Sequence, residues 1–280
     1  MLRKKLKLSP VKEPDKSTTN EDKNPHLIEA NEEDIPTIFL NYEQQLSLEL
    51  NNLTFSFPVH YIYNPLEYAW EPHSTFVKTY CKGTKDVLFL GLNPGPWGMC
   101  QTGIPFGEVN ISKEWLKMNG EVEKPKDECP KKQIKGFECH RSEESGKRFY
   151  GFFKNLCRTP EAFFKNAFVY NLCPLAFMKK ESANITPHEL KGQIKKDIEN
   201  ICGKTLVDIL KLLDIKIIVA LGRYTEKQAI EITQGFQLGH IKVIYMPHPS
   251  PRVVGNNNWA EKAQNVLDTN DLLQYFNNNN

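Results

Sequence analysis

Four short and almost continuously apolar runs alternate with longer amphipathic stretches along the chain. The apolar runs are 86–92 (DVLFLGL), 167–172 (AFVYNL), 216–222 (KIIVALG) and 242–247 (KVIYMP). The stretches with helical spacing include 146–157, 187–214 and 224–234. Strands without polar alternation are typical of parallel sheets that are covered on both faces. The pattern therefore predicts an α/β fold with three layers, in which helices flank a four-stranded parallel sheet.

The limits of this domain follow from the same pattern. Apolar residues recur at helical spacing from about residue 35, and a closing helical stretch ends near residue 276. Residues 1–12 carry five Lys or Arg, and residues 13–34 carry eight acids and two Lys. We predict a disordered charged tail over 1–34, one domain over 35–276 and a disordered Asn tail over 277–280. Within the domain, 120–145 is a long polar segment with no clear period.

Composition narrows the class of protein. The net charge is only +2, so the weakly basic body suits a protein that touches a few phosphates. Seven Cys without a CxxC pair, and no secretory or membrane-spanning apolar run, predict an intracellular protein with free thiols. No metal site, cofactor or membrane association is expected, and we expect a monomer. The basic head RKKLK fits either a nuclear-import signal or a solvated terminus, and we expect a nuclear protein.

Polar residues follow three of the predicted strands. Residues 91–109 (GLNPGPWGMCQTGIPFGEV) hold five Gly and three Pro after the first strand, beginning with Asn93. Asn171 ends the second strand, and His248 to Arg252 (HPSPR) follow the fourth. Each has an ordinary structural explanation alone, as a turn, a strand-end hydrogen bond or a loop residue. Ligands of open α/β sheets bind at the carboxyl ends of the strands, so together these elements predict a site.

The residue types indicate recognition of a nucleobase. The amides of Asn93 and Asn171 can read a base edge, and Phe106 offers a stacking face. His248 can stabilise an anion, and Arg252 can reach a phosphate or enter a duplex. The chain lacks a Ser-His-Asp order, a phosphate-binding GxxxxGK[ST] and a zinc deaminase pattern. Base recognition without a nucleophile or metal indicates excision by water.

Two other classes of function compete with this one. A catalytically silent nucleic-acid-binding protein could use the same pocket to capture bases, and a nucleotide-binding enzyme could wrap the Gly/Pro loop around a phosphate. Asn93 and His248 together argue against the silent protein, since capture alone needs neither. No Lys, Ser or Thr ends the loop as a phosphate site would require.

Three motifs, in their order and spacing, resemble the single-strand-selective monofunctional uracil-DNA glycosylases. They are GLNPGPWGMCQTGIPFGEV, FVYNLCPL and HPSPR, and YIYNPLEYAW and ESGKRFYGFFKNLC are also similar. The resemblance covers about residues 39–275. It implies the uracil-DNA glycosylase fold and hydrolysis of the N-glycosidic bond of uracil and 5-hydroxymethyluracil-type lesions, in single- and double-stranded DNA. Such an enzyme starts base excision repair and needs no cofactor.

The resemblance also implies a role for each matching residue. For catalysis, Asn93 would position water and His248 would stabilise charge on uracil O2. For base binding, Phe106 would stack on the flipped base, Asn171 would bind the uracil edge, and Gly95 and Met99 would line the pocket beside C5. For duplex opening, Pro249, Ser250 and Pro251 would wedge the duplex and Arg252 would fill the vacated space. Val253, Val254 and Gly255 stand where the family usually has Asn-Pro, and Trp97 and Cys100 stand in place of Phe and Ala. We therefore expect an altered far end of the wedge and a modestly altered pocket.

Overall fold

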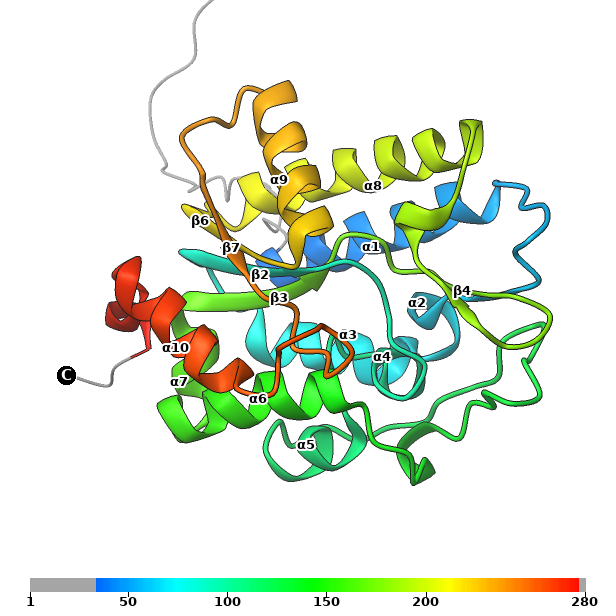
Figure 1. Cartoon of the computed structure of the whole chain (residues 1–280), viewed down its shortest axis with the longest axis horizontal. Coiled ribbons are helices and arrows are strands. Elements are labelled where there is room, and N and C mark those ends of the chain that lie inside the picture. The colour runs from blue at the N-terminus through cyan, green and yellow to red at the C-terminus, as the bar shows by residue number, and fades with distance from the viewer. Residues whose placement is uncertain (1–33, 277–280) are drawn as a thin grey trace, which may run out of the picture. The chain divides into compact units, whose positions relative to one another are not determined.

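Four parallel strands form the centre of the computed structural model, which describes residues 34–276, all within one unit that spans Glu33–Asn280. The strands are β2 (Val87–Gly91), β3 (Ala167–Asn171), β6 (Ile217–Leu221) and β7 (Lys242–Met246), and their order in the sheet is β3-β2-β6-β7 (Figure 1). Every residue of β2 and β3 is buried. The four predicted strands are confirmed to within one residue at each end, because continuous apolar runs suit a sheet buried on both faces.

Helices cover both faces of this sheet and confirm the predicted three layers (Figure 1). One face carries α1 (Ile35–Asn51), α8 (Gln193–Leu212) and α9 (Arg223–Gly235), and the other carries α6 (Glu144–Cys157), α7 (Pro160–Asn166) and α10 (Trp259–Thr269). Helix α3 (Trp70–Tyr80) contacts both α1 and α7. Beneath β2, Phe89 packs its ring against Phe149 and Phe153 of α6 at 5.4 and 5.0 Å between centroids. The sheet is thereby fixed to the helix that borders the site.

The end of the predicted N-terminal tail and the start of one predicted helix differ from the structure. The side chain of Asp34 accepts a hydrogen bond from the Thr37 N–H at 3.0 Å and caps α1, so the last residue of the predicted tail belongs to the fold. The rest of the predicted tails, 1–33 and 277–280, lies outside the described residues. The helix predicted from 187 begins only at Gln193, after a 3₁₀ turn (Pro187–Glu189) and Gly192, whose φ of +70° is not helical.

A second, smaller sheet was not predicted. Strands β1 (Tyr61–Tyr63), β4 (Ala176–Met178) and β5 (Asn184–Ile185) pair antiparallel in the order β1-β4-β5, next to the short helix α2 (Pro65–Tyr68). Of the predicted polar segment 120–145, residues 120–142 precede α6 and its N-cap and contain one 3₁₀ turn, Gly136–Glu138; the name polar segment is kept for 120–142. Its buried Cys129 and Ile134 join the small core beneath this sheet. Strands of two or three residues are too short to show a period.

A buried His–Glu pair connects the two outer elements α1 and α3. His73 Nε2 lies 2.6 Å from a carboxylate oxygen of Glu43, and both side chains are almost completely buried. Burial alone would lower the pKa of His73, but the Glu43 carboxylate raises it above its usual value. The other ring nitrogen, Nδ1, hydrogen-bonds the carbonyl of Gly103 at 2.7 Å. The pair therefore also holds the loop after β2. No helix within residues 34–276 is long and apolar enough to cross a membrane.

Candidate active site

The loop that follows β2 is held from several sides. It contains the short helix α4 (Met99–Thr102) and leads into α5 (Val109–Glu114). The hydroxyls of Tyr68 and Tyr150 donate to the carbonyls of Cys100 and Pro105 at 2.8 and 2.9 Å. Gly103 has a φ of +73°, and a Cβ there would lie 2.6 Å from the carbonyl oxygen of Ala69. The many Gly and Pro residues thus allow close packing of backbone and produce a rigid loop.

The main chains after β2 and β3 remain paired beyond the ends of the strands. The Leu172 N–H donates to the Gly91 carbonyl, and the Cys173 N–H donates to the Leu92 carbonyl, both at 2.9 Å. This pairing brings the residue after Leu92, Asn93, beside the end of β3. The Asn93 Nδ2 donates to the Leu175 carbonyl at 3.2 Å. That bond fixes the amide, whose Oδ1 is the atom able to accept a hydrogen bond from water.

Asn171 presents a buried amide with an unused acceptor. Its Nδ2 donates to the sulfur of Met99 at 3.2 Å, and its Oδ1 is buried without a hydrogen-bond partner. Gly91 makes room for it, because a Cβ at position 91 would overlap Oδ1 and approach the Phe106 ring to 2.7 Å. An unpaired buried acceptor is costly in a folded protein and indicates a ligand that donates a hydrogen bond there.

Phe106 lies next to this amide in an unusual backbone conformation. Its φ is +57°, which is rare for a residue with a large side chain and is found most often at functional sites. Its ring stacks on Phe149 at 5.2 Å and lies 5.9 Å from the ring of His248. Gly146 of α6 has no side chain because the Phe106 carbonyl fills that space. The packing of α6 therefore stabilises the conformation of Phe106.

His248 is held as a neutral ring in one tautomer. Its Nδ1 accepts a hydrogen bond from the Ser250 N–H at 3.1 Å, so the ring proton is on Nε2. Burial lowers the pKa of His248 to about 4, which leaves the ring uncharged at neutral pH. Asn256 Nδ2 donates to the carbonyls of His248 and Ser250, each at 2.9 Å, and Trp259 Nε1 donates to the Pro247 carbonyl at 2.7 Å. Asn256 was not predicted, since it begins a run of three Asn that has no distinguishing pattern.

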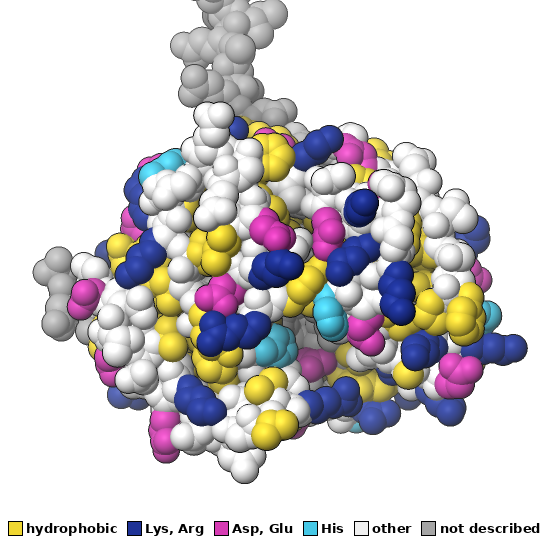
Figure 2. Space-filling view, turned by 45° about the horizontal axis from the view of Figure 1, so that its top comes forward, with side chains coloured by type: hydrophobic (Ala, Val, Ile, Leu, Met, Phe, Trp, Pro, Cys, Tyr) yellow, Lys and Arg dark blue, Asp and Glu magenta, His cyan; other side chains and the backbone are white. Residues whose placement is uncertain are grey.

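The predicted residues divide between a groove and the layer beneath it. The groove has a volume of about 810 Å³. Those that line it are Asn93, Gly95, His248, Ser250, Pro251 and Arg252, and those buried rather than lining it are Met99, Phe106, Asn171 and Pro249. Figure 2 shows a hollow in one face of the molecule, with basic and acidic side chains interspersed around it.

Glu143 is a groove residue that the sequence did not indicate. Its side chain lies where side chains at Gly95 and Gly98 would otherwise be. Burial raises the pKa of the Glu143 carboxyl, while the N–H groups of Trp97 and Ser145 act in the opposite direction. It follows the polar segment and precedes α6, a position in which an acid is usually a solvated helix-start residue. Only the folded chain reveals its contact with the loop.

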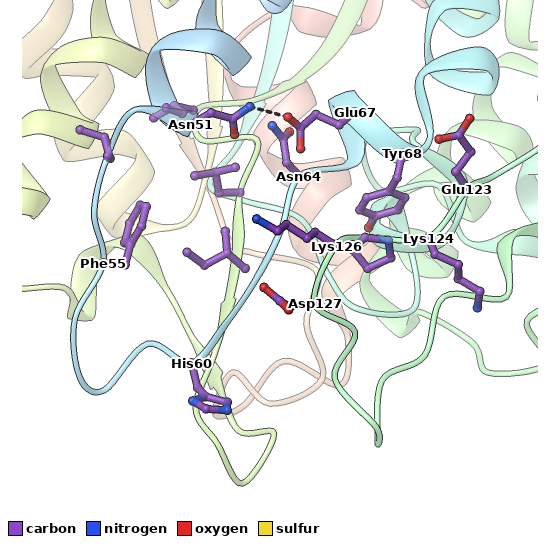
Figure 3. A pocket seen from close by; sticks show the side chains of 15 residues that line it. Asn51, Phe55, His60, Asn64, Glu67, Tyr68, Glu123, Lys124, Lys126 and Asp127 are labelled. Atoms are coloured by element: carbon purple, nitrogen blue, oxygen red, sulfur yellow. Dashed lines mark hydrogen bonds between the residues drawn. The ribbon is translucent and has the colours of Figure 1, made fainter.

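A second pocket, of about 360 Å³, is lined by charged, polar and apolar side chains (Figure 3). Asn51 donates to Glu67 at its edge, and His60, Lys126 and Asp127 also line it. None of the predicted site residues lines this pocket. Within residues 34–276, no group of three His, Cys, Asp or Glu side chains is arranged to hold a metal ion, and the seven Cys are free and buried.

Comparison with known proteins defines the class. Residues 77–274 match the model of the uracil DNA glycosylase superfamily. The single-strand selective monofunctional uracil DNA glycosylase of Mus musculus is 45% identical to this chain over 236 residues, which cover 84% of each chain. That of Bos taurus is 44% identical over 236 residues, which cover 84% of this chain and 86% of the relative. A crystal structure of SMUG2 from Pedobacter heparinus shares the fold, with a TM-score of 0.58, 16% identity, and coverage of 84% of this chain and 98% of that one.

The fold and the named relatives are those of DNA glycosylases, which confirms the predicted class of enzyme. The chain belongs to the uracil DNA glycosylase superfamily, and within it to the family of the single-strand selective monofunctional enzymes.

Proposed function

We propose that this protein excises uracil and 5-hydroxymethyluracil from DNA by hydrolysis of the N-glycosidic bond, and so begins base excision repair. The observation that carries the proposal is the buried, unpaired Oδ1 of Asn171, next to Phe106. The N3–H of uracil is a donor and its O4 an acceptor, which matches the two ends of an amide. Cytosine has the reverse arrangement, an acceptor at N3 and a donor at N4, so it would pair only with a flipped amide that has lost its Nδ2 contact with Met99.

The geometry supports a mechanism based on stabilised charge. Base extrusion costs a few kcal/mol, and the aromatic wall at Phe106 returns part of this by stacking. Cleavage leaves negative charge on the uracil, which the Nε2–H of the neutral His248 can stabilise through a hydrogen bond. Asn93 cannot remove a proton, so it orients the attacking water through Oδ1. The reaction therefore needs no covalent intermediate.

Release of abasic sites from a defined oligonucleotide tests the proposal. The full chain is incubated with a labelled single-stranded oligonucleotide that carries one uracil, and alkali then reveals abasic sites. We expect strand breaks only after alkali, and no protein–DNA product on borohydride treatment, because Lys132, the lysine that lines the groove within residues 34–276, donates to Asn184. A protein that binds this oligonucleotide but releases no uracil would be the silent base-binding protein instead.

Discrimination at C5 is a separate part of the proposal. Uracil and thymine share one hydrogen-bonding edge, so Asn171 cannot separate them, and a tight apolar wall would contribute only about 1–3 kcal/mol. We propose that backbone between Gly95 and Met99 holds a water beside C5. A hydroxymethyl group replaces the hydrogen bonds of that water, whereas a methyl group does not. A competition assay should show release of uracil and 5-hydroxymethyluracil, and comparable release of thymine would contradict the water model.

Action on duplex DNA would depend on the loop after β7. Arg252 lines the groove, and Val254 at the tip of the loop is 97% exposed. We propose that Pro249 to Pro251 part the base pairs while Arg252 occupies the space of the extruded nucleotide. The relatives are named single-strand selective, and we expect the same preference, because a duplex adds the cost of unpairing.

A nuclear location remains part of the proposal. It rests on the basic residues 1–12, which lie outside the described residues, and on the DNA substrate. Fluorescent fusions with and without residues 1–12 would test it, with loss of nuclear enrichment expected for the shortened chain.

A further inference from the structure

The polar segment 120–142 has no role in the mechanism above, yet it brings charged side chains to the groove and to its wall. Lys132 lies among the groove-lining residues, as does Trp97 of the loop after β2. The guanidinium of Arg141 stacks over the Trp97 ring at 4.1 Å from its centroid. Lys132 therefore shares the groove with Arg252, and Arg141 lies against the groove residue Trp97.

The backbone that carries Lys132 is held firmly in place. The hydroxyl of the buried Tyr63 donates to the Lys132 carbonyl at 2.9 Å. The next carbonyl, that of Gln133, accepts from Gln101 Nε2 at 3.1 Å, and Gln101 Oε1 accepts from the Lys135 N–H at 2.8 Å. Gln101 belongs to α4, so the segment is tied directly to the catalytic loop. A lysine on a fixed backbone is already in position for a ligand.

Lys132 and Arg252 line the groove together with two acids, Glu143 and Glu144. Burial lowers the pKa of Lys132, and the charges of Arg252 and Arg141 lower it further. The ammonium of Lys132 donates to the amide oxygen of Asn184. In the part of the chain that the structure describes, none of these three cations has a salt bridge to a carboxylate. Burial raises the pKa of the Glu143 carboxyl while the charge of Arg252 lowers it, so this acid offsets part of the positive charge. Mutual repulsion favours a bound anion at this point.

We propose that Lys132 and Arg141, together with Arg252, bind the phosphodiester backbone of single-stranded DNA beside the nucleotide that enters the groove. The identity of the ligand rests on the proposed function, since phosphates flank any base presented to this site. We name these three residues the cationic rim. Trp97 holds the Arg141 guanidinium flat by a cation–π contact, which leaves its N–H edge free for phosphate oxygens. The polar segment is therefore a strand-holding element.

Salt dependence of binding tests this inference without catalysis. Affinity of the full chain for a dye-labelled single-stranded oligonucleotide without uracil is measured by fluorescence anisotropy over a range of KCl concentrations. Each lost phosphate contact lowers the slope of log affinity against log salt by about 0.7 for a single strand. We expect this loss for Lys132→Gln and for Arg141→Gln, and about twice the loss for the double variant.

Matched variants separate contact from folding. Lys131→Gln removes the same charge at an exposed neighbour that does not line the groove, and it should keep the wild-type slope. Lys132→Arg keeps the charge and should also keep the slope. If Lys132→Gln and Arg141→Gln bind with the wild-type slope, the cationic rim is overturned, even if the wild-type chain excises uracil. If both slopes fall while the wild-type chain releases no uracil, the rim stands and the proposed function fails.

Discussion

The side chain of Glu143 occupies the space that a side chain at Gly95 would need. A carboxylate from the start of α6 therefore lies directly against the loop after β2, where Gly98 gives it further room. This contact gives a second structural reason for glycine at positions 95 and 98. These glycines permit not only a close approach of backbone to a base but also insertion of a neighbouring side chain.

Gly95→Ala should lower uracil release by displacing Glu143 and the loop, and Glu143→Ala should relieve this clash. In a double-mutant cycle, we expect the double variant to retain about fivefold more activity than the two single losses predict, a coupling of about 1 kcal/mol. Gly151→Ala is the matched control, because a Cβ there meets no atom within 4 Å. Additive losses would show that the two positions act independently.

Asn93→Ala and His248→Leu should each reduce single-turnover excision of uracil by about 10²–10³, because each removes a preorganised polar contact at the reacting groups. Both residues lie on loops beyond strand ends, so the thermal unfolding midpoint should change little. His240→Leu, at an exposed loop position, should leave the rate unchanged. A wild-type rate in either site variant would remove that residue from the mechanism.

Folding stability should carry a pH signature of His248. Its folded pKa of about 4 lies below the ordinary 6.5, so the unfolded chain binds its proton first as the pH falls. The contribution of His248 to the free energy of unfolding is therefore constant above about pH 6.5. As the pH falls from there towards 4, this contribution becomes progressively destabilising. The difference in unfolding free energy between wild type and His248→Leu, from urea titrations at several pH values, should change in this window. A constant difference would contradict a depressed pKa.

Arg252→Ala should impair excision from duplex DNA more than from single strands. Only a duplex leaves a space for the side chain to fill, whereas the phosphate contact is lost on both substrates. The ratio of kcat/KM on the two substrates, measured at one salt concentration, is the appropriate quantity. Equal losses on both would limit Arg252 to its place in the cationic rim.

The sequence by itself determined the layers of the fold and indicated which strand ends lie together. Near-continuous apolar runs could only be strands of a covered parallel sheet, and the carboxyl ends of such strands meet at one edge. Asn93, Asn171 and His248 could therefore be placed at this edge from their positions at or just beyond the ends of strands. Local pattern was sufficient because each of these residues depends on the strand immediately before it.

Only the tertiary structure decided how that site is completed. The contact between Glu143 and Gly95 and the presence of Lys132 and Arg252 in one groove join residues far apart in the chain, and Asn256 supports the His248 loop from eight residues further on. They come from segments without apolar periodicity, whose paths depend on hydrogen bonds to side chains such as Tyr63 rather than on their own pattern. The unpaired Oδ1 of Asn171 is likewise a property of its folded surroundings, because whether a polar atom finds a partner depends on every element packed around it.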